Sequence, residues 1–145
     1  MTHVRRTIAA ALVGALAGAL LLVVPASADA TAPVKVSECG LKKPTARPRS
    51  LVLACADASV VLDHLRWKYW GQQVATAVGT STENDCKPTC AAGHDHDYPI
   101  VATLWRVKSK TPGGSQFTRV TVTYAGQHPG RRAVVYDLRM YTPEG

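Results

Sequence analysis

Two cysteines and two histidines lie close together in the stretch CKPTCAAGHDHDYP, which runs from residue 86 to residue 99. Thiolates and imidazoles are common zinc ligands, so Cys86, Cys90, His94 and His96 could in principle hold a metal ion. The spacing argues against a structural zinc module, because one residue separates the two histidines where such modules use three to five. Whether the cysteines are thiolates or a disulfide depends on the compartment in which the protein resides.

The first residues of the chain have the features of a secretory signal peptide. Arg5 and Arg6 precede an apolar run over residues 8–24, and residues 26–28 (Ala-Ser-Ala) form a small-x-small cleavage site. A basic start, an apolar middle and such a site are typical of segments removed on export. We therefore expect residues 1–28 to be cleaved, with a second site after Ala30, leaving a secreted protein without a stable membrane span. A retained anchor is the alternative, because the apolar run is near the lower limit for crossing a bilayer.

All four cysteines follow the expected cleavage site, and an even count in a small exported domain indicates disulfides. Four cysteines allow three pairings. We expect the sequential one, Cys39–Cys55 with Cys86–Cys90, because Pro88 favours a turn that brings the thiols of the second pair together.

Oxidation of these cysteines would decide the chemistry of the loop, because a disulfide sulfur is no longer a thiolate ligand. The stretch is then expected to be a stapled, polar surface loop, with no metal or other cofactor. A two-histidine site at His94 and His96, assisted by Asp95 or Asp97, stays open as the alternative, because residues two apart share one face of a strand.

The remaining chain divides by composition. Residues 29–50 carry three prolines among small and basic residues, which predicts an extended leader tied down at Cys39. Residues 51–145 alternate β-rich runs with turn residues and are expected to form a single β domain. The formal net charge of +7 falls by two if Arg5 and Arg6 leave with the signal. A moderate positive charge favours anionic cell-surface polymers or acidic partners. The basic residues do not form the clustered stripe that is typical of nucleic-acid binders, so nucleic acid is not an expected partner.

Strand-like patterns recur through the β domain. Residues 110–115, which separate the runs 98–108 and 117–124, are typical of a turn, so a β-hairpin is expected over residues 98–124. Short strands separated by turns every ten or so residues predict a small antiparallel β-sandwich or barrel, here stapled by two disulfides. The expected strands are 51–56, 60–70, 73–80, 98–108, 117–124 and 133–140.

An aromatic cluster is the best functional lead in the sequence. Trp67, Tyr69 and Trp70 lie in one expected strand and Trp105 in another. Aromatic faces can stack on sugars or grip a peptide, so Trp70, Tyr69 and Trp67 are the candidate binding surface. We expect Trp67 and Trp105 to belong mainly to the core. Trp70, on the opposite parity and next to Gly71, is expected to be the exposed one.

No catalytic motif is visible in the sequence, neither GxSxG nor a P-loop nor HExxH. Ser, His and Asp are present without a spacing that implies a triad. His64 in the second expected strand and His128 in a Pro-Gly turn are expected to be ordinary surface groups. The chain is therefore not expected to be an enzyme.

The run from residue 47 to residue 107 resembles small exported proteins of actinomycetes. The motifs that carry the resemblance are, in order, CAD, WKYWG, AVGT, NDCKPTCAAG and YP. It brings no activity, because these proteins are labelled only as secreted. It implies a shared framework of Cys55, Asp57, Trp67, Trp70, Gly71, Cys86, Pro88, Cys90, Gly93 and Tyr98.

Together these features predict a secreted, non-catalytic binding module that acts at the cell surface or outside the cell. Its partner would be a cell-wall polymer or an extracellular protein. One alternative is a secreted proteinase inhibitor that presents the loop braced by Cys86 and Cys90. The other is a small extracellular hydrolase that uses Asp and His side chains.

Overall fold

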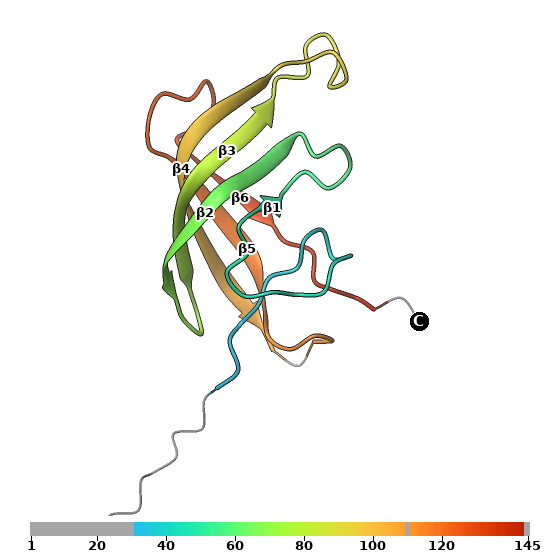
Figure 1. Ribbon diagram of the computed structural model, residues 1–145, viewed down its shortest axis with the longest axis vertical. Helices are drawn as coiled ribbons and strands as arrows, with labels where there is room; N and C mark the ends of the chain where they lie inside the picture. Colours follow the sequence, from blue (N-terminus) through green and yellow to red (C-terminus); the bar gives the residue numbers. More distant parts are fainter. Residues whose placement is uncertain (1–30, 110, 144–145) are drawn as a thin grey trace, which may run out of the picture. The chain divides into compact units, whose positions relative to one another are not determined.

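The computed structural model describes residues 31–109 and 111–143. The signal peptide expected over residues 1–28 lies outside the described residues. Within the described part, six strands form one sheet, each antiparallel to its neighbour and in chain order. The sheet curls into a half-barrel (Figure 1). The strands are β1 (Leu51–Val52), β2 (Val60–Trp70), β3 (Ala75–Asn84), β4 (Asp95–Lys108), β5 (Gln116–Tyr124) and β6 (Ala133–Asp137).

The all-β antiparallel class and the hairpin between β4 and β5 are thus confirmed. The bounds of β2 agree with those expected from its composition. The first expected strand shrinks to two residues, and β3 begins two residues later than expected and continues to Asn84. No helix within the described residues is long and apolar enough to cross a membrane.

The curl of the sheet depends on small side chains along the inner face of β3. Small inward residues let neighbouring strands bend toward one another while larger side chains on the flanks fill the interior. At Gly79 a Cβ atom would lie 2.7 Å from the Asp63 carbonyl oxygen and 3.0 Å from the Leu65 side chain. Glycine therefore permits the close approach of β2. The inward residues of β3 are Ala75, Ala77, Gly79 and Ser81.

Strand β2 does not keep the simple alternation that its sequence suggests. Its register against β3 shifts between Asp63 and Arg66 and again between Trp67 and Tyr69. The exposed His64, at the first shift, has a positive φ of 53°. Each shift returns the inner face after three residues instead of two, which is the effect of a β-bulge. Consequently both Trp67 and Trp70 pack against the core, and the expectation that Trp70 is exposed is wrong.

The segment before β1 belongs to the same compact unit as the sheet, which spans Thr31–Gly145. Val34 and Val36 are 1% and 2% exposed within the core, and Lys35 forms a bridge to Gln116 at the start of β5. The expected extended conformation is not kept throughout, because Val36 pairs antiparallel with Thr45 across a turn that includes Cys39 and Gly40. The segment is also not tied down at Cys39 alone, since Val34 and Val36 supply part of the core.

Hydrogen bonds from two indoles hold this segment in place. Trp67 Nε1 donates to the Pro48 carbonyl oxygen at 2.8 Å, and Trp70 Nε1 donates to that of Val34 at 2.9 Å. The two rings meet edge to face, with centroids 4.4 Å apart. Trp67 and Trp70 therefore pin the leader to the sheet.

All four cysteines are paired as expected, Cys39 with Cys55 and Cys86 with Cys90. The first bond ties the leader to the loop between β1 and β2. The second braces the loop between β3 and β4, at the tip of the sheet. By the loop-entropy relation, the first would stabilise the fold by about 3 kcal/mol and the second by about 2 kcal/mol.

Candidate functional site

The loop between β3 and β4 is organised around one carboxylate. Asp85 Oδ1 accepts hydrogen bonds from the backbone N–H groups of His94 and Lys87, at 3.0 and 3.1 Å. These donors, with a smaller contribution from His96, hold the pKa of Asp85 below its usual value of 3.8. The His96 ring lies 3.5 Å from the same carboxylate. Asp85 thus has a structural role in closing the loop.

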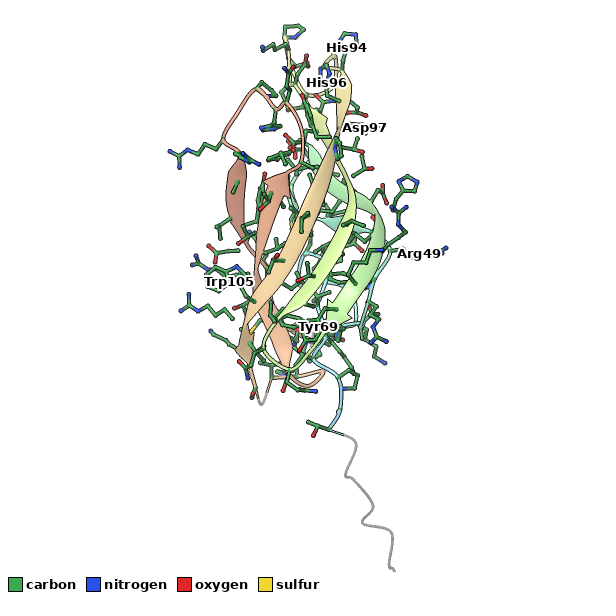
Figure 2. All side chains as sticks on the ribbon, turned by 90° about the vertical axis from the view of Figure 1, so that its left-hand side faces the viewer. Arg49, Tyr69, His94, His96, Asp97 and Trp105 are labelled. Atoms are coloured by element: carbon green, nitrogen blue, oxygen red, sulfur yellow. A yellow bond between two sulfur atoms is a disulfide. The ribbon has the colours of Figure 1, made fainter. Side chains whose placement is uncertain are left out.

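The histidines of this loop are not gathered into a set of metal ligands. His94 and His96 are both exposed at the tip of the sheet (Figure 2). Asp95 and Asp97, which could have assisted them, each accept a hydrogen bond from a side chain of β3. In the described part of the chain, one group of three potential ligands lies close together, Asp57 with the cysteines of the second disulfide, and those sulfurs are oxidised.

A polar cluster of Ser81, Glu83, Tyr124 and His128 lies at the same end of the sheet, on its inner side. Glu83 Oε1 accepts hydrogen bonds from Ser81 Oγ, at 2.8 Å, and from the Tyr124 hydroxyl. His128 Nε2 lies 3.1 Å from Glu83 Oε2, and His128 Nδ1 accepts from the Gly130 N–H at 3.1 Å. Because Nδ1 is an acceptor, Nε2 carries the proton that is donated to Glu83.

The electrostatics of the polar cluster favour an ionised carboxylate. Burial opposes ionisation, but the hydrogen bonds from Tyr124, Ser81 and His128 outweigh it and hold the pKa of Glu83 below 4.5. Burial and the hydrogen bond to Glu83 raise the pKa of Tyr124 well above its usual value of 10.0. The rings of Tyr124 and His128 stack with centroids 3.6 Å apart. The cluster is therefore a negatively charged, fully hydrogen-bonded unit.

This geometry does not suit nucleophilic catalysis. A serine nucleophile needs its proton directed at a base and its oxygen open to substrate. Ser81 is 0% exposed and donates to Glu83, not to His128. The His128 side chain is only 8% exposed, which corrects the expectation of a surface group. Sequence reasoning missed the cluster because 45 residues separate Glu83 from His128.

The outer face of the sheet carries a different arrangement, which we call the outer strip and define as Tyr69, Thr76, Thr103, Trp105 and Thr121. The register places Tyr69 opposite Thr76, Thr76 opposite Thr103, and Thr103 opposite Thr121. Three hydroxyl side chains therefore follow one aromatic ring across four strands. Trp105 lies on the next row of the same face.

The two aromatic residues of the outer strip are accessible. Tyr69 is 57% exposed and Trp105 is 36% exposed. A side chain at position 71 would collide with the Tyr69 ring, so Gly71 allows that ring to lie over the turn after β2. Figure 2 shows both aromatic side chains toward the end of the sheet that is remote from His94 and His96.

Trp105 is held in a polar setting. Its Nε1 donates to Thr121 Oγ1 at 3.0 Å, and the Arg119 guanidinium lies 5.8 Å from its ring centroid. Arg119 Nε is in turn 2.8 Å from Asp137 Oδ1. The expectation that Trp105 is a core residue is wrong.

The reason is the alternation of β4, which directs Ile100, Ala102 and Leu104 inward. In the sequence, Val101 and Val107 have the same parity as Trp105, which made that side of the strand look like the core side. The outer face of this sheet is itself rich in valine and threonine. Of the three aromatic residues expected to bind, only Tyr69 faces outward. Trp105 belonged to the aromatic cluster of the sequence but not to the expected binding surface, and nothing in the sequence indicated its partners Thr121 and Arg119.

Comparisons of this chain with protein-family models, with curated proteins and with solved structures gave no match.

Proposed function

We propose that this chain is a secreted, non-catalytic binding module whose ligand docks on the outer strip. The signal-like start of the sequence, the pairing of all four cysteines and the resemblance to exported actinomycete proteins support secretion. The oxidised pairs suit an extracellular setting, because thiols persist in reducing compartments and disulfides in oxidising ones.

The observation that carries this proposal is the exposure of two aromatic rings on one hydroxyl-rich face. Sugar rings have apolar faces that stack on aromatic side chains, and hydroxyl edges that exchange hydrogen bonds with threonine. Two strand spacings separate Tyr69 from the β4 row, which is about 10 Å. That distance suits two sugar units of one chain, so the ligand we propose is a cell-wall glycan.

Binding of the mature protein to purified wall glycans, by isothermal titration calorimetry, tests this function. Trp105→Ala and Tyr69→Ala are each expected to weaken binding about tenfold or more, in line with an aromatic contact worth about 1.5 kcal/mol. Leu41→Ala is the matched control, because Leu41 is 76% exposed and lies outside the outer strip. The proposal fails if no wall glycan binds, or if both aromatic variants bind like the wild type.

A proteinase inhibitor is the second candidate, favoured by the exposed loop that the Cys86–Cys90 disulfide braces. Residues 87–92 are all exposed. The carboxamide oxygen of Asn84 accepts the Cys86 N–H at 2.9 Å, which adds to the rigidity of the loop. Inhibition of serine proteinases that cleave after basic residues, abolished by Lys87→Ala, would support this function. Glycan binding that is lost with Trp105→Ala would speak against it.

A further inference from the structure

An open hollow of about 400 Å³ adjoins the outer strip, where β4, β5 and the segment after β6 meet. Arg106, Lys108 and Arg139 line it, and all three residues are exposed. Asp137 also lines the hollow, and it is the residue whose carboxylate contacts Arg119 beside Trp105. Because Arg106 also follows Trp105 directly in β4, the hollow lies near the aromatic end of the outer strip.

The charge of the hollow is unbalanced. Among the lining residues that the structure describes, Asp137 is the only carboxylate, and it already contacts Arg119 at 2.8 Å. Arg106, Lys108 and Arg139 form no ion pair with any carboxylate of residues 31–109 or 111–143. Three cations around one depression repel one another unless an anion is present. The hollow therefore favours an anionic ligand.

The backbone of β4 is distorted to bring Arg106 there. Strict alternation would direct the residue after the outward Trp105 toward the core, yet Arg106 is exposed too. Arg106 adopts a positive φ of 58°, which costs a non-glycine residue about 1 kcal/mol. Thr118 Oγ1 donates to the Arg106 carbonyl oxygen at 2.7 Å and holds this conformation. The consequence of this conformation is that Trp105 and Arg106, which are consecutive, are both exposed.

We propose that the hollow binds phosphate groups, and that the ligand of the outer strip is a glycan or polyol chain that carries them. Trp105 would stack on a sugar while the phosphate contacts Arg106, Lys108 and Arg139. Arginine pairs with phosphate through two parallel N–H donors. A tetrahedral phosphate can accept donors from several directions, as cations on separate elements require, whereas a planar carboxylate accepts mainly in its own plane. The net positive charge of the chain is complementary to such a polymer.

This inference rests on the proposed function and names the class of its ligand. Calorimetric titrations of the mature protein against a sugar–phosphate polymer and a neutral glucan, in low and high salt, test it. In low salt, the phosphate polymer should bind at least tenfold more tightly than the neutral glucan. This preference should shrink as the salt concentration rises. A polyuronate and a single-stranded oligonucleotide are the competitors. Equal or tighter binding of either one would overturn the assignment of a phosphate-bearing glycan.

The variants separate this inference from the proposed function. Arg106→Gln with Arg139→Gln should abolish the preference for the phosphate polymer and leave affinity for the neutral glucan unchanged. Arg131→Gln with Arg132→Gln makes the same change in charge on the exposed loop before β6 and should preserve the preference. If both pairs act alike, the effect is only net charge and the hollow is not the site.

Trp105→Ala should weaken binding of both the phosphate polymer and the neutral glucan. If Trp105→Ala and Tyr69→Ala both leave the two affinities unchanged, the proposed function fails, whatever the arginine variants do. If Trp105→Ala weakens both while the arginine variants keep the phosphate preference, only the inference about the hollow fails. Urea denaturation of each variant is the control for folding. It distinguishes a loss of binding from a loss of structure.

Discussion

The two ends of the sheet differ in whether their polar side chains have partners. At the end near the start of β4, the carboxylate of Glu83 has donors from Ser81, Tyr124 and His128. At the end of β4, the hollow collects Arg106 and Lys108 with no carboxylate to pair them within the described residues. The first group is largely buried and the second is exposed.

The difference indicates what each end does. A buried polar group that lacks partners destabilises the fold, so Glu83 and its donors are needed by the native structure itself. Exposed cations contribute little to stability and remain available to a ligand. Mutations at the polar cluster should therefore change the free energy of unfolding, and mutations at the hollow should change binding.

The sharpest test of this contrast is removal of the Glu83 carboxylate. Glu83→Ala leaves two hydroxyls and an imidazole without their acceptor and should lower the free energy of unfolding by about 3 kcal/mol. Tyr124→Phe removes only one donor and keeps the ring, so about 1 kcal/mol is expected. Urea denaturation measures both. A loss below 0.5 kcal/mol for Glu83→Ala, roughly the level of an ordinary surface change, would remove the contrast.

At acid pH, the polar cluster around Glu83 should contribute less to the stability of the fold. The pKa of Glu83 is lower in the folded state than the ordinary 4.5, so its stabilising contribution is complete above pH 4.5. This contribution is lost as the pH falls through the folded pKa. Stability of the wild type between pH 5 and pH 2.5 should thus fall more steeply than that of Glu83→Gln. Asp57 and Asp85, whose pKa values are also lowered, supply the decline that both proteins share. Parallel pH profiles would contradict the assignment.

Mutations at the hollow should hardly change the free energy of unfolding. Neutralising Arg106, Lys108 and Arg139 together with glutamine should change the free energy of unfolding by no more than about 0.5 kcal/mol. In low salt the change should be a small gain, because the mutual repulsion of the three cations is removed. A loss of more than 1 kcal/mol would mean that these cations have structural partners, and the contrast between the ends would no longer hold.

The smallest effect is expected at the tip of the sheet. Zn²⁺ or a chelator should leave the thermal midpoint of the wild type unchanged within about 1 °C, because His94 and His96 share no third ligand among the residues described. His94→Asn with His96→Asn should respond in the same way. A zinc-dependent rise that this double variant abolishes would restore the two-histidine site.

How far the sequence could predict this structure depends on local pattern. The alternation of Phe117–Tyr124 and the turn before it were enough to predict the β4–β5 hairpin, because both signals are local. The faces of Trp70 and Trp105 were predicted wrongly. Trp70 follows the second register shift of β2, between Trp67 and Tyr69, which no local sequence pattern indicated. Trp105 keeps the regular alternation of β4, but the valines on its face made that face look like the core side.

The candidate sites were harder to predict for another reason. Glu83 and His128 meet only when the loop after β5 folds over the sheet, and no spacing in the sequence encodes that contact. The hollow likewise combines Arg106 with Arg139, from β4 and from the segment after β6. Val34 and Val36 had apolar character, but the surrounding prolines hid their contribution to the core.

The small side chains of β3 have a consequence for the shape that a ligand meets. They let the two halves of the sheet bend about β3, so the outer face of the curled sheet is convex (Figure 1). Tyr69 and Trp105 lie on this outer face. A convex ridge touches a flat crystalline surface only along a line, whereas a single flexible chain can drape over it. If the outer strip binds a glycan as we propose, the protein should therefore favour loose strands over ordered fibres.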